Sequence, residues 1–208
     1  MERIIEPEIL DHLDPLDPEA QRSRADLNWI NRLMATRGWM LRKLDAISPE
    51  VDAVIELGPG DGLLLNAVHQ RFPEIRCIGY DFVERPDSVA PGIEWVSGDF
   101  MDKLDTMPVN QGTVILANLI LHHLHRDQLE QLRDSISKAA MLIAVEPDRS
   151  RTSLWLGQIL RPFVGRVTRS DMMVSICAGF GRGELAEIFQ RTSQMESVWL
   201  GGRRVVLR

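Results

Sequence analysis

The sequence predicts an α/β fold with a three-layer, doubly wound sheet of seven strands, mostly parallel and closed by a C-terminal antiparallel hairpin. Three observations support this prediction. Short apolar runs alternate with helical patterns along the 208 residues. These runs are apolar on both faces, which is typical of parallel strands that helices cover on either side. A pair of glycines, Gly201 and Gly202, separates the last two runs and is expected to supply positive φ angles in a hairpin turn.

The first part of the chain is expected to form an arm and two helices. Residues 1–18 contain three prolines among scattered acids, which predicts an irregular arm. Residues 19–47 carry apolar side chains at helical spacing on both sides of Gly38, so we expect two helices that meet near this glycine. Ser48-Pro49 then ends the helical pattern.

The sheet is expected to take five strands from the middle of the chain and two from its end. They are predicted at residues 51–57, 75–81, 93–97, 113–119, 141–146, 194–200 and 203–207. Helical patterns follow at residues 63–71, 126–137 and 183–191, and residues 151–180 interrupt the alternation with apolar helical material. Strands that alternate with helices predict parallel pairing, and the short glycine turn predicts antiparallel pairing at the end.

The composition is that of an ordinary globular protein. Hydrophobic residues make up 44% and charged residues 26% of the chain, which excludes a disordered or fibrous protein. The longest apolar stretches, such as Val114–Leu121, are much shorter than the ~18 residues of a membrane span, and no basic-then-apolar leader opens the chain. We therefore expect a cytoplasmic protein without stable membrane insertion. Cys77 and Cys177 lie outside any cluster with metal-ligand spacing and are expected to be reduced thiols.

Charge is distributed unevenly along the chain. The net charge of -6 disfavours a nucleic-acid substrate, because binding a phosphate backbone needs a broad basic surface. Residues 149–208 contain ten arginines, no lysine and four acids, so they carry +6 and residues 1–148 carry -12. These arginines either face water or attract an anionic substrate or carrier phosphate.

A glycine-rich turn follows the first predicted strand. It reads Glu56-Leu-Gly-Pro-Gly-Asp-Gly62. Glycines let the backbone approach a ligand closely, and open α/β sheets bind ligands at the carboxyl ends of their strands. A dinucleotide-binding loop would carry its third glycine at position 63, where this chain has leucine. Asp81 follows about 20 residues after the loop, at the distance where an acid binds ribose hydroxyls. Packing alone is the alternative role for such glycines.

Four ordered landmarks make residues 50–208 resemble the class I S-adenosylmethionine-dependent methyltransferases, which have a Rossmann-like fold. Residues 56–62 match their glycine loop, and Asp81 matches the acid at the end of their second strand. Gly98-Asp99-Phe100 matches the acid after the third strand, and the predicted hairpin matches their antiparallel end. The resemblance implies S-adenosyl-L-methionine as the cofactor.

The resemblance also implies which residues contact the cofactor. These are Glu56, Gly58, Gly60, Gly62, Asp81, Phe82, Asp99, Phe100 and Asn118. Glu56 is expected either to fix the turn or to meet the ammonium group of the cofactor. Each of the two aspartates has an alternative role as a helix cap. The phenylalanines either flank the adenine or pack in the core.

A narrower resemblance concerns the acceptor. Residues 117–124, 146–151 and 175–180 resemble small bacterial methyltransferases related to ubiquinone- and polyketide-modifying enzymes. This implies O- or C-methylation of a small, lipophilic or aromatic acceptor. Residues 1–48 would form an arm and helices that cover the active site, and residues 49–208 the methyltransferase core, with 151–181 as a helical substrate-cover insertion. Apolar residues of both covers are expected either to line the acceptor site or to pack helices: Trp29, Trp39, Trp155, Met172, Met173 and Ile176.

The predicted catalytic residues follow the fourth strand. Methyl transfer needs the acceptor held in line with the methyl carbon, and a phenol or acidic carbon also needs a base. Histidine suits that role, and His122 and His123 are the candidates, with His123 preferred as the base. Asn118 is the third predicted catalytic residue and is expected either to touch the cofactor or an acceptor hydroxyl or to serve a turn. His122 has an alternative role as a helix cap. A metal is not expected, because adjacent histidines point apart and no nearby Cys/His set completes a ligand shell.

Other roles and functions remain open from the sequence. Glu146, at the end of the fifth strand, either assists in the pocket or pairs with Arg149 or Arg151. The alternatives to an active methyltransferase are a non-catalytic S-adenosylmethionine-binding partner subunit and a Rossmann-type oxidoreductase.

Overall fold

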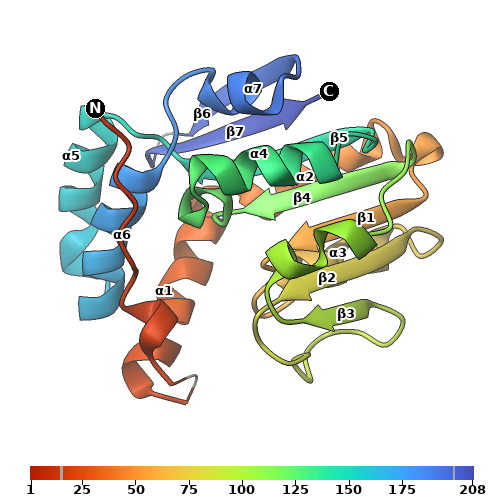
Figure 1. The fold of residues 1–208 in the computed structure, drawn as a ribbon. Helices are drawn as coiled ribbons and strands as arrows, with labels where there is room; N and C mark the ends of the chain where they lie inside the picture. Colours follow the sequence, from red (N-terminus) through yellow and green to blue (C-terminus); the bar gives the residue numbers. More distant parts are fainter. Residues whose placement is uncertain (15, 199) are drawn as a thin grey trace.

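A seven-stranded sheet forms the centre of the molecule (Figure 1), with strand order β3-β2-β1-β4-β5-β7-β6. The computed structural model describes residues 1–14, 16–198 and 200–208. Neighbouring strands are parallel except for β7, which is antiparallel to both β5 and β6. The strands are β1 Ala53–Leu57, β2 Arg76–Asp81, β3 Glu94–Ser97, β4 Thr113–Asn118, β5 Met141–Pro147, β6 Ser193–Val198 and β7 Gly202–Leu207. The predicted fold class is confirmed.

Helices cover both faces of the sheet, which gives the three layers. One hydrophobic cluster includes residues of α1, α2 and α3, and the other includes residues of α4, α7 and η3. The α-helices are α1 Pro18–Leu33, α2 Thr36–Asp45, α3 Leu63–Arg71, α4 Arg126–Ser135, α5 Arg151–Leu160, α6 Arg166–Ala178 and α7 Glu184–Phe189. Short 3-10 helices are η1 Leu10–His12, η2 Ser48–Glu50, η3 Phe100–Thr106, η4 Leu121–His123 and η5 Arg161–Phe163.

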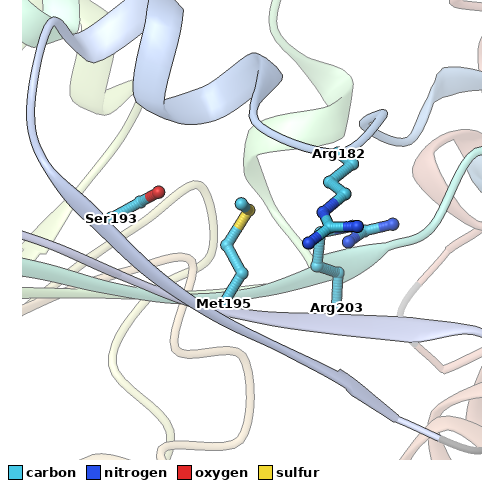
Figure 2. A pocket seen from close by; sticks show the side chains of 4 residues that line it. All are labelled: Arg182, Ser193, Met195 and Arg203. Carbon is cyan, nitrogen blue, oxygen red and sulfur yellow. The ribbon is translucent and has the colours of Figure 1, made fainter.

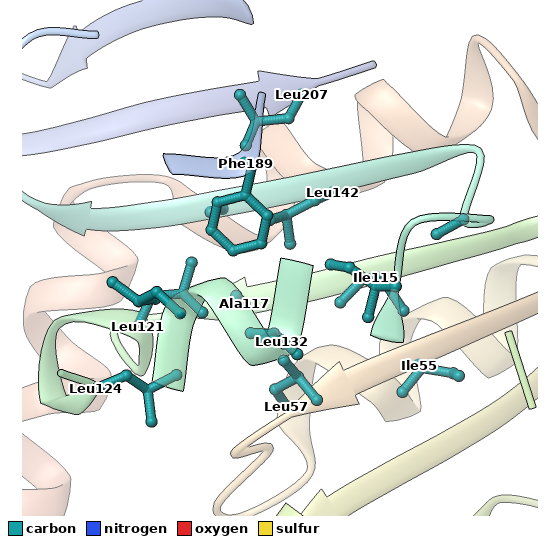
Figure 3. Close-up of a cluster of buried hydrophobic side chains, with 14 of the residues drawn as sticks. Ile55, Leu57, Ile115, Ala117, Leu121, Leu124, Leu132, Leu142, Phe189 and Leu207 are labelled. Atoms are coloured by element: carbon teal, nitrogen blue, oxygen red, sulfur yellow. The ribbon is translucent and has the colours of Figure 1, made fainter. Parts of the chain in front are cut away.

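The strands contribute alternate side chains to the two clusters. Val114 and Leu116 of β4 face the cluster under α2 and α3, whereas Ile115 and Ala117 face the cluster under α4 and α7. All four are fully buried. Figure 3 shows the second cluster, in which Phe189 of α7 packs over the sheet. Successive strand residues point to opposite faces, so a strand buried on both sides must be apolar throughout.

The break between the first two helices differs from the prediction. It lies at Ala35, which has a left-handed backbone with φ 50°, and Gly38 lies inside α2. A non-glycine residue rarely adopts this conformation, because its Cβ crowds the backbone. Met34 on one side of the break and Trp39 on the other are buried in the core. Burial of these side chains therefore fixes the break where no glycine marks it.

The C-terminal hairpin is confirmed, but its turn uses one glycine rather than two. Gly201 has φ 81°, whereas Gly202 is the first residue of β7. Trp199, in the predicted strand 194–200, lies outside the described residues, as does Pro15 of the predicted arm.

Helices α5 and α6, which follow β5 and precede α7 in the chain, pack against each other. In Figure 1 they stand with α1 at the side of the molecule toward which β4 points. The N-terminal arm runs along α6, where Ile4 N–H donates to the Cys177 carbonyl at 3.2 Å. Both cysteines are free, Cys77 buried and Cys177 partly exposed. Across the described residues, every helix is too short or too polar to traverse a bilayer.

Candidate active site

The ends of four parallel strands bring the predicted site residues to one edge of the sheet. Strand β1 lies between β2 and β4, so the chain order reverses at β1 and β4. Leu57 pairs with Tyr80 of β2 and with Ala117 of β4. The glycine loop therefore starts beside Asp81 and Asn118. In open α/β sheets this switch point is where ligands bind.

The three glycines of the loop have left-handed backbones, with φ 62° at Gly58, 55° at Gly60 and 71° at Gly62. A Cβ at Gly58 would lie 2.9 Å from Ile120 Cδ1, so Gly58 is required for packing against the segment after β4. A Cβ at Gly60 would meet none of the described atoms within 4 Å. Packing thus explains Gly58, whereas the open space at Gly60 leaves room for a ligand close to the backbone.

Asp81 ties the glycine loop to the end of β2. Its Oδ2 accepts a hydrogen bond from Gly60 N–H at 2.7 Å, and its Oδ1 accepts one from Val83 N–H at 3.1 Å. The next element of the described chain is β3, so Asp81 caps no helix there. The carboxylate is partly exposed, and it presents an acceptor group directly beside the loop.

Glu56 is a buried carboxyl group next to the loop. Its side chain is 2% exposed, and its Oε2 has no hydrogen-bond partner among the described residues. Burial raises the pKa of Glu56 to about 8, the charge of Asp81 adds to this rise, and the Leu65 amide opposes it. An ionised carboxylate at this position needs a cation.

The segment after β4 holds Asn118 and a strained neighbour. Asn118 Oδ1 is buried, and none of the described groups donates to it. Leu119 has φ 56°, and its N–H donates to the Val145 carbonyl at 2.8 Å. A left-handed leucine costs roughly 1–2 kcal/mol, and such strain collects at functional sites.

Three other predicted cofactor contacts have different surroundings. Asp99 caps η3, since its Oδ1 accepts from Met101 N–H at 2.8 Å, as its alternative role predicted. Phe100 is 4% exposed and packs in the core. Phe82, which follows Asp81, is 68% exposed. Of the two aromatic rings, only Phe82 is accessible to a ligand.

His122 is held in the interior by Glu146. The Glu146 carboxylate is fully buried, lies 2.8 Å from His122 Nδ1, and accepts from Ile120 and Leu121 N–H at 3.1 and 2.8 Å. The sequence-based pairing of Glu146 with Arg149 or Arg151 is wrong: Arg149 pairs with Glu184 at 2.7 Å. The carboxylate instead closes the turn after β4, where three N–H groups converge on it.

The N-terminal arm adds Glu8 to the histidines, which sequence reasoning missed. Glu8 Oε1 lies 3.5 Å from His122 Nε2 and 4.0 Å from His123 Nε2, and Ser175 Oγ donates to the same oxygen. Burial alone would raise the pKa of Glu8, but its interactions with His122 and His123 lower it. A lone glutamate in an irregular arm has no spacing pattern that points to a site.

The two histidines differ in charge. Burial by itself would lower the pKa of His122, but hydrogen bonding to Glu146 and Glu8 outweighs this and raises it to about 9. Burial and the nearby positive charge of His122 lower the pKa of His123. At neutral pH the structure therefore holds a charged His122 beside a neutral His123, whose side chain is 30% exposed.

The expectation that the adjacent histidines point apart is wrong. Their ring centroids are 4.2 Å apart, and both rings turn toward Glu8. Glu8, His122 and His123 place three possible metal-ligand atoms within 4.8 Å of one another. Among the described residues, these three are the group whose ligand atoms lie close enough together to hold a metal ion.

Hydrogen bonds fix the arm beside the histidines. Arg3 donates to the His122 and Leu124 carbonyls at 3.0 and 2.9 Å, and to Ala178 at the end of α6 at 2.7 Å. Asp171 of α6 accepts from Ile9 and Leu10 N–H at 2.9 and 3.0 Å. The arm thereby joins the segment after β4 to α6.

The apolar residues expected to cover an acceptor site differ in their exposure to solvent and in their contacts. Trp39 is buried in the core, and its Nε1 donates to Glu196 at 3.1 Å. Trp155 is 63% exposed and Trp29 is 40% exposed. On α6, Met172, Met173 and Ile176 lie against Gly157 of α5. Lining of a closed pocket is therefore not supported for Trp39 or Trp155.

A hollow of about 610 Å³ lies away from these residues. Figure 2 shows it between the C-terminal hairpin and the segment before α7, lined by Arg182, Ser193, Met195 and Arg203. Arg203 pairs with Asp148 in a short hydrogen bond, which neutralises part of the positive charge. Much of the C-terminal arginine excess is likewise paired inside the structure, as for Arg149.

Comparisons of the sequence find no match, either among protein-family profiles or among curated proteins. The structure does match solved ones. The plantazolicin methyltransferase BpumL, in complex with a pentazolic desmethylPZN analog and SAH, has a TM-score of 0.68 and 12% identity, over 92% of this chain and 91% of that chain.

Two other solved structures share the architecture. The pyocyanin biosynthetic protein PhzM has a TM-score of 0.61 and 17% identity, over 97% of this chain and 61% of that chain. The methyltransferase domain of bacterial CtHen1 has a TM-score of 0.54 and 12% identity, over 83% of this chain and 96% of that chain. These likenesses show that the chain adopts the class I methyltransferase fold.

Proposed function

We propose that this protein is an S-adenosylmethionine-dependent methyltransferase that methylates an oxygen or carbon atom of a small, lipophilic or aromatic acceptor. The observation that carries the proposal is the junction of the glycine loop with Asp81 at the switch point of the sheet. The backbone at Gly60 has open space beside it. Among the described residues, no group donates a hydrogen bond to the buried Glu56 Oε2 or to the buried Asn118 Oδ1.

The chemistry of these residues fits the proposed cofactor. Asp81 offers carboxylate oxygens to a ribose diol, and the loop glycines offer close backbone approach. Glu56 can accept from an ammonium group, which would supply the cation that its buried carboxylate lacks. Asn118 and the exposed ring of Phe82 complete the proposed contacts, and Asp99 contributes the oxygen that does not cap η3. The Phe100 side chain packs in the core, so it is left out of this set.

His123 is proposed as the base. S-adenosylmethionine supplies an electrophilic methyl group when bound, so the protein must align the acceptor and remove its proton. His123 is neutral at pH 7 because burial and the charge of His122 lower its pKa. Its Nε2 lies 4.0 Å from Glu8 Oε1 and its Nδ1 lies 3.9 Å from Asp11 Oδ2. A proton taken up at either nitrogen is therefore stabilised by a carboxylate.

His122 is proposed to position His123 and to keep it neutral. The charged His122 ring is fixed by Glu146 on one side and Glu8 on the other. The same pairing argues against a metal at Glu8, His122 and His123. Two carboxylates stabilise the proton on His122, and a protonated imidazole offers no lone pair to a metal ion.

The proposed partners are small molecules rather than nucleic acids, because the net charge of -6 provides no broad basic surface. The free thiols agree with a reducing compartment, so we place the reaction in the cytoplasm.

The test is to incubate the isolated chain with radiolabelled S-adenosylmethionine and a panel of phenols, hydroxyquinones and enolisable diketones. Labelled product from any of them supports an active enzyme. Cofactor binding by calorimetry, without transfer to any acceptor, would instead favour a non-catalytic partner subunit. Absence of cofactor binding would overturn both. A thermal shift with a nicotinamide cofactor in its place would revive the oxidoreductase alternative.

A further inference from the structure

Large apolar side chains line the outer face of α5 and η5. Trp155, Ile159 and Phe163 are 63%, 46% and 69% exposed. They follow one another at intervals of four residues, which places them above one another along a helix. Figure 1 shows α5 as the outermost helix on its side of the molecule, with α6 between it and the rest. Together these three side chains form an apolar stripe in contact with solvent.

The opposite face of α5 makes the contacts that hold it in the molecule. Ser153 and Gly157 are buried, and a Cβ added to Gly157 would lie 3.1 Å from Ile176 Cδ1 of α6. Trp155 and Ile159 each lie two residues further along, which is about 200° around an α-helix. The stripe is therefore not used to pack α5 against α6.

The segment that carries the stripe is basic, although the whole chain is acidic. Residues 149–170 contain five arginines and no acid, in a chain of net charge -6. Arg151, Arg161 and Arg166 are exposed. Arg151 lies one turn before Trp155 on the same face of α5. Arg161 begins from a different face, but it donates to Gln158 at 2.9 Å, which brings its guanidinium to the edge of the stripe. Among the described residues, Glu19 is the acid that pairs with one of these three arginines, 3.7 Å from Arg166.

We propose that the outer face of α5 and η5 docks on an anionic lipid surface. Trp155, Ile159 and Phe163 enter the boundary between headgroups and acyl chains, while Arg151 and Arg161 contact lipid phosphates. An apolar stripe flanked by arginines is the pattern of helices that lie in a membrane interface. No helix of the described chain is long and apolar enough to span the membrane, so the protein lies on its surface.

Charge favours a lipid surface over a second copy of this chain. In a two-fold contact through this face, Arg151 and Arg161 of one copy would meet the same arginines of the other. Such like-charge contacts oppose association. An anionic bilayer offers a negative charge to every exposed arginine on this face.

Docking would also turn the side of the molecule that holds the site toward the lipid, with α5 and α6 between the two. Helices α5 and α6 stand at the side of the molecule toward which β4 points, where the proposed acceptor site lies (Figure 1). A lipophilic acceptor dissolved in the membrane would then be concentrated near that side of the molecule. This consequence rests on the proposed function, whereas docking itself does not.

Co-sedimentation with vesicles tests the docking without any cofactor or acceptor. The full chain is mixed with vesicles of phosphatidylcholine alone or with added phosphatidylglycerol, at low and high salt. We expect binding to the anionic vesicles and release by salt. Trp155→Ala/Phe163→Ala should abolish binding, and Arg151→Gln/Arg161→Gln should weaken it by about fivefold per arginine. Trp29→Ala is the matched control, because Trp29 is 40% exposed on α1, and it should bind as the unchanged protein does.

Each other outcome overturns the proposal. Failure of the full chain to sediment with anionic vesicles does so directly, as does binding that the Trp155→Ala/Phe163→Ala variant retains. A dimer seen by sedimentation velocity, dissociated by the same variant in the absence of lipid binding, would show that a second copy covers the stripe. Circular dichroism of each variant establishes that it is folded. A methyltransferase assay that fails while vesicle binding persists would refute only the proposed function.

Discussion

Three buried glutamates of the candidate site differ in what they meet. Glu146 accepts from backbone N–H groups and from His122, and Glu8 contacts both histidines. Glu56 has one oxygen without any partner in the described structure. Because a buried carboxylate is stable only with a partner, Glu56 is the one that is prepared for a ligand cation.

The contribution of Asp81 to cofactor binding can be measured directly. Asp81→Ala should weaken S-adenosylmethionine binding by one or more kcal/mol, about tenfold, because a charge-assisted hydrogen bond is lost. Isothermal titration calorimetry gives the affinity. Asp105→Ala, an exposed acid in η3, is the control and should bind normally. Unchanged affinity of Asp81→Ala would refute the ribose-binding role.

Glu56 predicts that cofactor binding releases a proton. Its pKa of about 8 means that the free protein carries a protonated Glu56 at pH 7. An ammonium group beside it favours the ionised form, so binding should release up to about one proton and strengthen as pH rises from 6 to 8. Calorimetry at pH 7 in buffers of different ionisation enthalpy measures this proton. Glu56→Gln, which cannot ionise, should bind without release. Equal release from both proteins would assign the proton to another group.

His123 should govern turnover but not cofactor affinity. His123→Ala should lower kcat by about 10²–10⁴-fold, the usual contribution of a positioned base. Because the pKa of His123 lies below the ordinary histidine value, the unchanged enzyme should keep full activity to mildly acidic pH. Initial rates at saturating acceptor from pH 5 to 8 test both points. A His123→Ala enzyme with normal kcat would show that alignment alone suffices.

The sequence identified the residues whose roles depend on local spacing. The glycine loop and Asp81 are found from their positions at strand ends. Glu8 lies more than a hundred residues from His122 in the chain, and only the path of the arm brings them together. The predicted pairing of Glu146 with Arg149 or Arg151 is wrong for a similar reason. Those arginines are near Glu146 in sequence, whereas His122, its partner in the structure, lies in the segment after β4.

At the scale of elements, turn residues determine most ends of helices and strands, and burial of side chains determines the others. Each strand was predicted to within two residues at both ends, because each is an apolar run that stops at a polar turn. The break between α1 and α2 falls at Ala35 because Met34 and Trp39 must both reach the core. No sequence rule places a left-handed alanine there.

The arm is the element whose attachment to the site can be tested. Arg3→Ala removes hydrogen bonds to the His122, Leu124 and Ala178 carbonyls, each worth about 1 kcal/mol. We expect the arm to detach, water to reach His123, and kcat to fall while cofactor affinity is unchanged. Steady-state kinetics and calorimetry measure the two effects.

Detachment of the arm should also change how turnover depends on pH. Because burial is the largest cause of the lowered His123 pKa, the acidic limb of the Arg3→Ala rate profile should move toward higher pH. Glu6→Ala, an exposed arm residue, is the control and should leave the profile in place. An unmoved profile in Arg3→Ala, with normal kcat, would show that the arm does not shape the site.

At the scale of the whole molecule, the covered and mainly parallel sheet was predictable from the sequence, and the acceptor site was not. Alternating apolar runs allow few arrangements other than a covered parallel sheet, and the terminal hairpin excludes several of those. The site was predicted to be covered by helices. The sequence does not show which of their apolar residues pack the helices and which line the acceptor site. Only the structure separates buried Trp39 from exposed Trp155.

Two buried groups, His122 and Glu56, predict that the protein loses stability as pH rises above neutrality. The pKa of His122 is raised to about 9 in the folded protein, so its stabilising charge is fully present below about 6.5 and is lost as pH rises through about 9. The pKa of Glu56 is raised to about 8, so its contribution is likewise lost between about 4.5 and 8. Both groups act in the same direction, and each is worth a few kcal/mol, at roughly 1.4 kcal/mol per unit of pKa.

The melting temperature should therefore fall from about pH 6.5 to pH 9.5, because below about pH 6.5 the lowered pKa of His123 acts in the opposite direction. Glu56→Gln keeps the shape of the neutral side chain and removes its ionisation, so it should make the decline below pH 8 shallower and leave there only the part that His122 causes. Above pH 8 the remaining decline comes from His122, which loses its proton and its stabilising charge as pH rises through about 9. Differential scanning calorimetry of both proteins across this range, in buffers of matched ionic strength, measures the two parts. A melting temperature that rises between about pH 6.5 and 9 would mean that His122 and Glu56 do not carry the buried protons assigned to them, and with that the neutral His123 beside a charged His122 would lose its basis.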